Sequence, residues 1–361
     1  MSFSYTTIRQ LLFCLDPETA HSLTVRLLGL AAGIPAAQHW MTRKFDMDDP
    51  CLETEVFGLR FRNSVGIAAG YDKNALAAGG LAALGAGHVE IGTITPLPQS
   101  GNRHPRLFRL PTHEALINRM GFPNAGAKAI ASRLTKLRAR PIHAKLGINI
   151  GKGHTTLIEK AHVDYSILLR RLHPYADYLA VNVSSPNTLG LRQLQAKEAL
   201  GCLMDELMQA HRQVCSSTPI LVKIGPDLSL AEVDDVLEVI LHCGASGVIA
   251  TNTTSTRMGI CRSDLTEKGG LSGTPLRDHS TEIIRYIYRQ TGGKLPIIGV
   301  GGVNSTTAAL EKIRAGASLV QVYTGLVYRG PSLLRVINAG MLQEMDNLGV
   351  SSLMQLVGSQ T

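Results

Sequence analysis

In the stretch Tyr178-Leu-Ala-Val-Asn-Val-Ser-Ser-Pro-Asn-Thr188, an apolar strand runs directly into a group of hydrogen-bonding side chains. Asn182 and Ser184 lie two residues apart, so they project from one face of the strand while valines project from the other. Pro186 cannot donate a hydrogen bond to a sheet and keeps Ser185 out of helical backbone angles. We therefore expect Ser185 at the carboxyl-terminal end of a strand, where α/β barrels hold their catalytic groups.

Taken alone, this cluster also fits an ordinary polar turn, for which Ser, Pro and Asn are common residues. From about Pro50 onward, however, short apolar runs alternate with helix-like segments, which is typical of parallel strands joined by helices. Eight such units fit a closed barrel better than an open sheet of five or six strands. The sequence thus predicts a (β/α)8 TIM barrel with strands near residues 64–68, 88–93, 144–150, 177–184, 220–225, 247–253, 296–301 and 318–323.

The segment before the barrel has a different pattern. Apolar residues recur at helical spacing from Ile8 to Leu15, and Asp16-Pro17-Glu18 supplies an N-cap, a first-turn proline and an acidic first turn for a second helix. This pair is either a helical hairpin packed on the barrel or a lipid-facing port, and both descriptions can hold. The predicted organisation is an N-terminal helical extension (1–45), a barrel domain (46–345) and a C-terminal tail (346–361). Within the barrel domain, residues 52–62 should form a small antiparallel piece that closes the bottom, and residues 107–118 an insertion over the upper rim.

Composition narrows the classes of function. The chain has 361 residues, 44% of them hydrophobic, and a formal net charge of +8. It has no long Lys/Arg run or zinc-finger spacing, so we expect no nucleic-acid partner. The six cysteines form no Cys-x-x-Cys pair and follow no signal peptide, which favours free thiols in a reduced compartment. No apolar run reaches the roughly 20 residues that cross a bilayer, and no metal-ligand spacing is present.

Glycine-rich segments follow the last two predicted strands. The run Ile297-Ile-Gly-Val-Gly-Gly302 ends one strand, and residues 315–325 contain the next strand and its exit. Glycines let backbone amides approach a ligand closely, and many eight-stranded barrels bind a phosphate in the loops after strands seven and eight. Tight turns also need glycine, but two such loops in tandem favour a phosphate site.

Two lysines are candidates for charge recognition. Lys223 lies inside the apolar run Ile220–Gly225, where a buried ammonium is costly without an anionic partner. We therefore expect a ligand or a carboxylate beside it. Lys73, in Ala68-Ala-Gly-Tyr-Asp-Lys73, follows the first strand; on its own it is more typical of a solvated surface charge.

Amides and hydroxyls recur at the other strand ends. One buried asparagine is usually structural, but five around one rim suggest a planar ligand rich in C=O and N–H groups, since an amide both donates and accepts hydrogen bonds. These residues are Asn118, Asn149, Asn182, Asn187 and Asn252, accompanied by Thr93, Thr251 and Thr253.

Several motifs in this order resemble the dihydroorotate dehydrogenases of the quinone-dependent class. The resemblance extends from about Ile8 to Pro331 and rests on residues 68–73, 90–96, 118–122, 182–188, 250–254 and 269–273 and on the tail glycines. It implies an FMN-containing barrel that oxidises (S)-dihydroorotate to orotate in pyrimidine biosynthesis. By the same resemblance, Ser185 is the base that removes the C5 proton while hydride passes from C6 to the flavin.

The resemblance also implies a set of ligand contacts. Orotate contacts map onto Lys73, Asn118, Arg119, Met120, Gly121, Phe122, Asn182, Asn187, Asn252 and Thr253. FMN contacts map onto Ala69, Gly70, Tyr71, Asp72, Lys73, Thr93, Asn149, Asn182, Lys223, Thr251, Gly273, Gly302, Tyr323 and Thr324. Tyr71 departs from the family, which often has an aliphatic residue there.

The class assignment rests on two features. The cytosolic class is similar in the barrel but has a cysteine at the position of Ser185 and lacks the helical extension that residues 1–45 provide here. In the membrane class the extension lines a tunnel for ubiquinone or menaquinone, and His21 and Arg109 are candidates to border it. The resemblance further implies a monomer bound peripherally to the cytoplasmic face of the bacterial inner membrane.

Two other functions remain open on sequence grounds. Another FMN-dependent TIM-barrel pyrimidine or dihydrouridine oxidoreductase would need a nicotinamide or iron–sulfur electron source. A membrane-apposed flavin-binding module without catalysis would keep the phosphate loops and dispense with Ser185 and Lys73.

Overall fold

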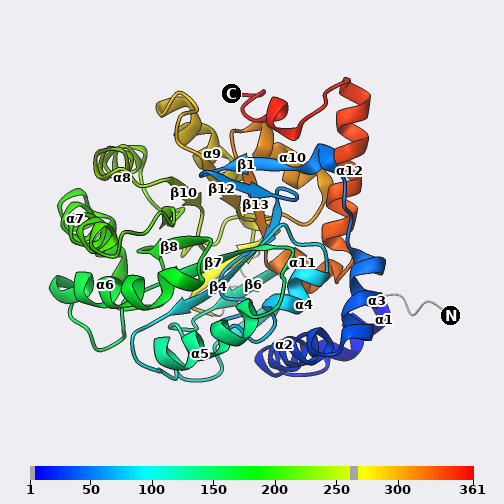
Figure 1. Cartoon of the computed structure of the whole chain (residues 1–361), viewed down its shortest axis with the longest axis horizontal. Helices are drawn as coiled ribbons and strands as arrows, with labels where there is room; N and C mark the ends of the chain where they lie inside the picture. Colours follow the sequence, from blue (N-terminus) through cyan, green and yellow to red (C-terminus); the bar gives the residue numbers. More distant parts are fainter. Residues whose placement is uncertain (1–4, 261–266) are drawn as a thin grey trace.

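The computed structural model describes residues 5–260 and 267–361. Its centre is a closed barrel of eight parallel strands in the order β10-β12-β13-β3-β4-β7-β8-β9 (Figure 1). The predicted (β/α)8 barrel is thus confirmed, and each of the eight predicted strands is present. The barrel strands are β3 (Val65–Ile67), β4 (His88–Ile94), β7 (Lys145–Ile150), β8 (Tyr178–Asn182), β9 (Ile220–Ile224), β10 (Gly247–Ala250), β12 (Ile297–Val300) and β13 (Leu319–Val322).

Helices surround these strands, as Figure 1 shows. Most are amphipathic, with their apolar faces turned to the sheet. They are α4 (Ala78–Ala83), α5 (Gly126–Arg138), α6 (Ala161–Leu172), α7 (Lys197–Gln213), α8 (Leu230–Cys243), α9 (Arg277–Gln290), α10 (Thr306–Arg314), α11 (Thr324–Arg329) and α12 (Leu333–Leu348). After α12 the chain ends in a short 3-10 helix, Leu353–Leu356, whose two leucines are buried.

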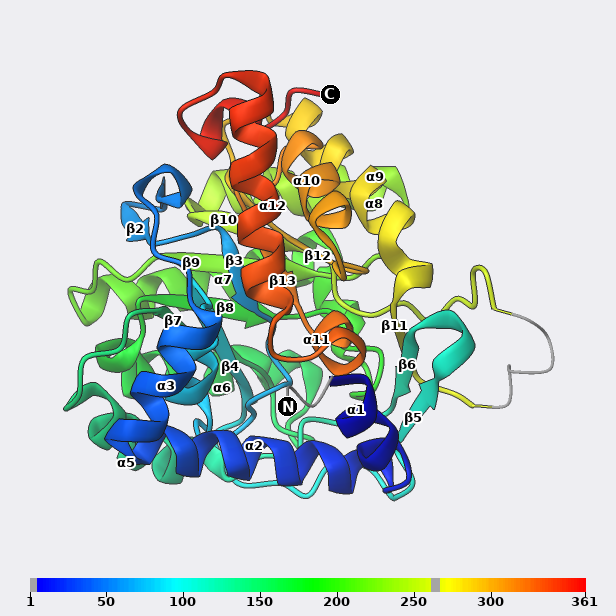
Figure 2. The ribbon, with the colours of Figure 1, turned by 90° about the vertical axis from the view of Figure 1, so that its right-hand side faces the viewer.

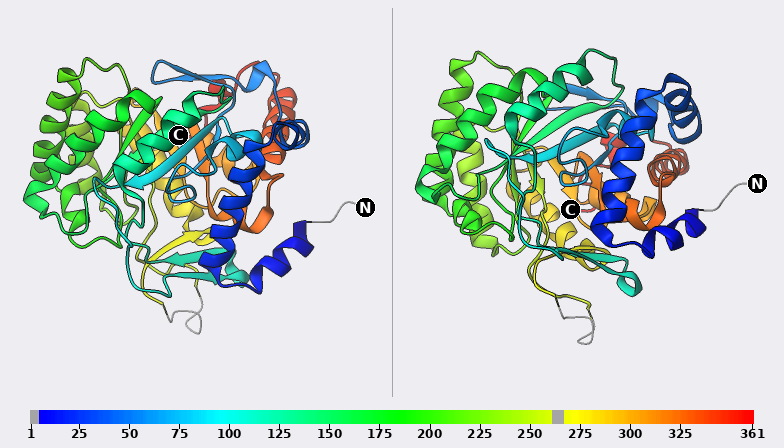
Figure 3. Two further views of the ribbon diagram at one scale, coloured as in Figure 1. Left: turned by 60° about the horizontal axis from the view of Figure 1, so that its bottom comes forward. Right: turned by 90° about the horizontal axis from the view of Figure 1, so that it is seen from below.

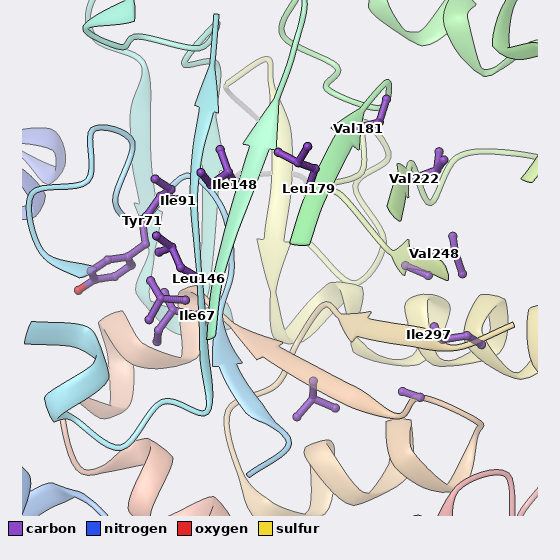
Figure 4. Packing of buried hydrophobic residues seen from close by; sticks show 14 of the residues in the cluster. Ile67, Tyr71, Ile91, Leu146, Ile148, Leu179, Val181, Val222, Val248 and Ile297 are labelled. Atoms are coloured by element: carbon purple, nitrogen blue, oxygen red, sulfur yellow. The ribbon is translucent and has the colours of Figure 1, made fainter. Parts of the chain in front are cut away.

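The strands alternate as their sequences predict. In β8, Leu179 and Val181 point outward and pack under the helices, with Ile148 and Val222 of neighbouring strands in the same layer (Figure 4). Tyr178 and Ala180 point into the barrel, and Asn182, two residues further, shares their face. The strand ends at Asn182, earlier than predicted. The Asn182 side chain accepts a hydrogen bond from Ser184 N at 3.2 Å, which turns the chain out of the ladder.

The two ends of the barrel are covered differently. The expected antiparallel piece is the hairpin β1 (Thr54–Val56) and β2 (Leu59–Phe61). Its Phe61 ring lies 5.7 Å from the ring of His88, the first residue of β4, so the hairpin closes the amino-terminal end. The expected insertion is β5 (Leu107–Leu110) and β6 (Ala115–Asn118), and Figure 2 shows it at the opposite side of the molecule. A strand that was not predicted, β11 (Gly270–Gly273), pairs with β6.

The N-terminal extension contains three helices, α1 (Tyr5–Phe13), α2 (Pro17–Gly33) and α3 (Pro35–Phe45), grouped on one side of the barrel (Figure 3). Asp16 caps α2 as predicted, accepting from Glu18 N and Thr19 N. The third helix was not foreseen; Pro35 occupies its first position, where proline is tolerated.

Of this extension, α2 packs directly on the barrel helix α4. A β-carbon on Gly80 of α4 would lie 2.5 Å from Leu28 O of α2, so the two helices approach closely. None of the described helices combines the length and apolar character that crossing a bilayer requires.

The tight barrel interior yields a stability prediction. A β-carbon on Gly147 of β7 would lie 2.2 Å from Cζ of the buried Tyr178 ring, so Gly147→Ala should destabilise the fold by ~1–3 kcal/mol. Gly201 in α7 has nothing within 4 Å of its hypothetical β-carbon, so Gly201→Ala should stabilise it by ~0.5–1 kcal/mol. Thermal unfolding followed by circular dichroism measures both, and a Gly147→Ala variant as stable as wild type would contradict the described packing.

Candidate active site

A cavity opens at the carboxyl-terminal ends of the barrel strands. We call it the rim cavity. Its lining contains most of the residues predicted from the sequence: Ala69, Gly70, Lys73, Thr93, Asn118, Met120, Gly121, Phe122, Asn182, Ser185, Asn187, Lys223, Thr251, Asn252, Thr253, Gly273, Gly302, Tyr323 and Thr324. Side chains from distant parts of the sequence therefore meet in one space.

Ser185 lies in the rim cavity and is 6% exposed. Pro186 follows it, and the chain then turns so that the backbone N–H of Asn187 donates to Ser185 Oγ at 3.3 Å. Among the described residues, no carboxylate or imidazole is hydrogen-bonded to this hydroxyl. A proton acceptor at this position would therefore depend on the enclosure of the cavity and not on a neighbouring base.

Asparagines form a connected group beside Ser185. Asn187 Nδ2 donates to Asn118 Oδ1 at 3.0 Å, which ties the loop after β8 to the end of β6. Asn252 Nδ2 lies 3.0 Å from Ser184 Oγ and 3.3 Å from Asn182 Oδ1. These bonds fix the amide planes, so the remaining donors and acceptors face the cavity in set directions.

A buried ion pair forms the floor of the rim cavity. Lys223 Nζ lies 3.3 Å from Glu90 Oε1, and the two side chains are 6% and 0% exposed. The predicted anionic partner of Lys223 is thus a carboxylate of the neighbouring barrel interior. Glu90 also accepts from Asn149 Nδ2 at 2.8 Å and from Gln321 Nε2 at 2.9 Å, so its charge is well solvated by the protein.

The roles of Glu90 as the partner of Lys223, and of Gln321 as a donor to Glu90, were not predicted from the sequence. The signal was present, because Glu90 stands inside the apolar strand His88–Ile94 just as Lys223 stands inside β9. A second buried charge of opposite sign in another barrel strand is the natural partner of the first.

Lys73 lies at the opposite wall of the cavity, with Nζ 3.4 Å from His21 Nε2 of α2. Burial lowers the pKa of the Lys73 ammonium to about 8, while the carboxylates of Glu18 and Asp72 oppose this shift. Burial, and then the charge of Lys73, hold the pKa of His21 well below its ordinary value. The pair therefore places one cation, with a neutral imidazole behind it, beside the cavity at neutral pH.

Four predicted contact residues lie outside the lining. Asn149 sits one layer below, accepting from Thr93 Oγ1 at 2.6 Å. Asp72 accepts from the backbone of Leu76 and Ala77, which shapes the loop after β3. Tyr71 faces α2, and Arg119 pairs with Glu267 at 2.6 Å.

The far end of the rim cavity is a cradle of backbone. Gly273, Gly301 and Gly302 have φ angles of +101°, +125° and +70°, in the left-handed region that favours glycine. A β-carbon on Gly302 would lie 2.9 Å from the backbone nitrogen of Arg277. Thr324 contributes a hydroxyl within 2.8 Å of Ser272 Oγ. Such close backbone packing with hydroxyls nearby suits a phosphate group.

The lining fits a flavin in a further respect. Thr251 Oγ1 and Gln321 Oε1 are buried cavity-lining atoms with no hydrogen-bond partner among the described residues. Buried polar atoms normally have partners, so these two are available to a polar ring. The cradle, the orphaned atoms and the cation of Lys223 together suit a planar, carbonyl-rich ring that bears a phosphate. No group of His, Cys, Asp and Glu in the described part of the chain could hold a metal ion.

A second cavity lies between α1, α2 and the barrel. We call it the helix cavity. Its lining is mostly apolar and includes Ile8, Leu12 and Leu27, and both predicted tunnel residues, His21 and Arg109, border it. Arg109 lies 4.4 Å over the Phe13 ring and donates to Leu15 O at 2.9 Å. Tyr323 lines both cavities, so the two cavities are adjacent at this residue.

Comparison with known proteins agrees with this architecture. The family model for dihydroorotate dehydrogenase matches residues 51–345. A protein of Anaeromyxobacter dehalogenans named dihydroorotate dehydrogenase (quinone) is 47% identical over 98% of this chain and 96% of its own length. A protein of the same name from Gloeobacter violaceus is 48% identical over 98% of both chains.

A solved structure is also similar. The crystal structure of DHODH from Eimeria tenella in complex with ferulenol superposes with a TM-score of 0.87, at 38% identity and 95% coverage of both chains. The family model covers most of the chain, and the relatives match it nearly end to end. The chain therefore belongs to the dihydroorotate dehydrogenase family.

Proposed function

We propose that this protein oxidises (S)-dihydroorotate to orotate with bound FMN and passes the electrons to a membrane quinone, in de novo pyrimidine (UMP) biosynthesis. The observation that supports this most is the continuity of the site. One cavity holds Ser185, the asparagine group, Lys223 and the glycine cradle, and a second apolar cavity touches it through Tyr323. Relatives named dihydroorotate dehydrogenase (quinone) match along nearly the whole chain.

At the substrate end, Ser185 is the proposed base for the C5 proton. That proton is acidified by the adjacent carbonyl, and the enclosed cavity excludes bulk water. The hydrogen bond from Asn187 N–H orients the hydroxyl oxygen. Lys73 would offset the substrate carboxylate, and the amides of Asn118, Asn187 and Asn252 would read the pyrimidine edge, with Asn182 and Thr253 beside them.

At the cofactor end, dihydroorotate dehydrogenases are flavoproteins, and FMN is the flavin we propose. When bound, FMN accepts hydride and passes electrons onward. Lys223 would hold a positive charge beside the ring and favour the negative charge that the ring gains. The cradle around Gly273 and Gly302, with Thr324, would hold the phosphate. Asp72, Arg119 and Asn149 would act indirectly, because they lie outside the cavity lining.

At the acceptor end, the helix cavity is the proposed quinone site, bordered by His21 and Arg109. The outer faces of α1 and α2 expose large apolar side chains, among them Leu11 (68%) and Leu30 (67%). Such faces suit interfacial burial in a lipid headgroup region. We propose that the protein is a monomer bound peripherally to the cytoplasmic face of the bacterial inner membrane.

The role of Ser185 gives the first functional prediction. Ser185→Ala should retain flavin but slow its reduction by dihydroorotate by ~10² or more, because a general base is lost. Ser185→Cys restores a group that can accept a proton, so its rate should exceed that of the alanine variant and rise with pH toward about 8.5, the usual thiol value. Anaerobic stopped-flow absorbance measures both. Near-wild-type reduction in Ser185→Ala would remove the serine from the mechanism.

Two neighbouring leucines of α1 allow the proposed quinone site and membrane binding to be tested separately. Leu12 lines the helix cavity, whereas Leu11 lies outside the lining and is exposed. Leu12→Asp puts a carboxylate into an apolar site, so turnover with a short-chain soluble quinone should fall about tenfold or more while reduction by dihydroorotate is unchanged. Leu11→Asp should leave that turnover intact and weaken recovery with lipid vesicles. If Leu11→Asp and Leu12→Asp changed quinone turnover to the same extent and vesicle recovery to the same extent, the helix cavity and the exposed face of α1 would not have separate roles.

A further inference from the structure

Lys312, on α10, carries a fully buried ammonium group behind the glycine cradle. Its Nζ donates to Ser280 Oγ, to Thr281 Oγ1 at 3.0 Å and to the backbone oxygen of Arg277 at 3.3 Å. All three partners are electrically neutral, and no carboxylate of the described residues forms a salt bridge with it. This cation therefore has hydrogen bonds but no counter-charge.

Such a charge is expensive inside a protein. Burial lowers the pKa of Lys312 to about 7, opposed by the carboxylates of Glu311 and Asp278, while Arg277 lowers it further. Glu311 is already engaged, since it accepts from Arg277 Nε at 2.7 Å. A buried ammonium without an anion is disfavoured relative to an apolar side chain of similar size. Since neither carboxylate forms a salt bridge with Lys312, its presence is explained if another anion binds nearby.

The geometry connects Lys312 to the cradle through one hydroxyl. Ser280 Oγ lies 3.4 Å from the carbonyl oxygen of Gly301, and a β-carbon on Gly301 would meet Ser280 Oγ at 2.6 Å. In a planar trans peptide, the carbonyl of one residue and the N–H of the next point in opposite directions. Holding the Gly301 carbonyl toward Ser280 therefore directs Gly302 N–H away from Lys312. Gly301 and Gly302 both line the rim cavity.

We propose that Lys312 is the buried counter-charge of the cofactor phosphate and, through Ser280, positions the Gly301–Gly302 turn that binds it. The inference rests on the proposed function and deepens it, because it assigns a residue outside the cavity lining to cofactor affinity. The competing explanation is that Lys312 only clamps α9 to α10. The two explanations differ in what should happen to the flavin-free protein and to a flavin that lacks the phosphate.

The test compares FMN with riboflavin, which has the same ring and no phosphate. Full-length protein is stripped of flavin, and the Kd of each flavin is measured by fluorescence quenching. In Lys312→Met, the Kd for FMN should rise about tenfold or more, because a charge is lost near the phosphate. The Kd for riboflavin should change less than about twofold. The flavin-free variant should melt no lower than flavin-free wild type, because an uncompensated buried charge has been removed.

Two further variants sharpen the result. Lys312→Gln keeps a hydrogen-bond donor for Ser280 but is neutral, so it should lose the same preference for FMN. Lys152→Met is the matched control: this lysine is also buried and bonded to backbone oxygens, Gly153 O at 3.0 Å and Thr156 O at 2.7 Å, but these partners belong to the loop after β7 and not to the glycine cradle. It should keep the wild-type ratio of the two Kd values.

The outcomes separate the inference from the proposed function. An unchanged ratio in the Lys312 variants would overturn the inference alone. Equal weakening of both flavins, or a flavin-free variant that melts lower or fails to fold, would show a structural clamp and overturn it too. Wild-type protein that binds neither flavin would overturn the proposed cofactor, and the inference with it.

Discussion

The contact between Lys223 and Glu90 inside the barrel is the constraint on which the site depends. Two opposite charges, 3.3 Å apart and almost wholly buried, are tolerated only because amides from neighbouring strands complete their hydrogen bonds. Removal of one partner would leave the other uncompensated in the barrel interior. The pair fills the middle of the barrel, so the space above it becomes a cavity with a charged floor rather than a packed apolar core.

The rest of the chemistry is arranged around that floor. The register of β8 against β9 pairs Asn182 with Lys223, which sets the asparagine group directly above the ion pair. The loops after β12 and β13 place glycine backbone at the far wall, and the loop after β3 brings Lys73 to the near wall. The barrel supplies rigidity, while the loops supply much of the cavity lining. The N-terminal helices add the apolar helix cavity, which is the proposed site of the lipid-soluble electron acceptor.

The barrel strands and many residues of the rim cavity could be predicted from the sequence, because buried strands have a recognisable apolar pattern. Alternation in β8 predicted that Asn182 and Val181 lie on opposite faces, as they do, whereas the strand ends at Asn182 and not at Pro186. The hydrogen-bond and ion-pair partners of individual side chains were harder to predict. The partners of Asp72 are nearby backbone amides, and the partner of Arg119 is Glu267. Glu90 was missed although it stands inside an apolar strand, and Lys312 was missed because its hydroxyl partners come from α9, which no pattern within α10 identifies.

The visible spectrum of the purified protein during an anaerobic titration with dihydroorotate shows whether this substrate reduces a bound flavin. If the proposed function is correct, the protein is yellow. Its flavin band bleaches as dihydroorotate is added and returns when a soluble quinone is admitted. The proposed function would be contradicted by a colourless protein that binds no flavin. It would also be contradicted if NADH bleached the flavin band and dihydroorotate left it unchanged.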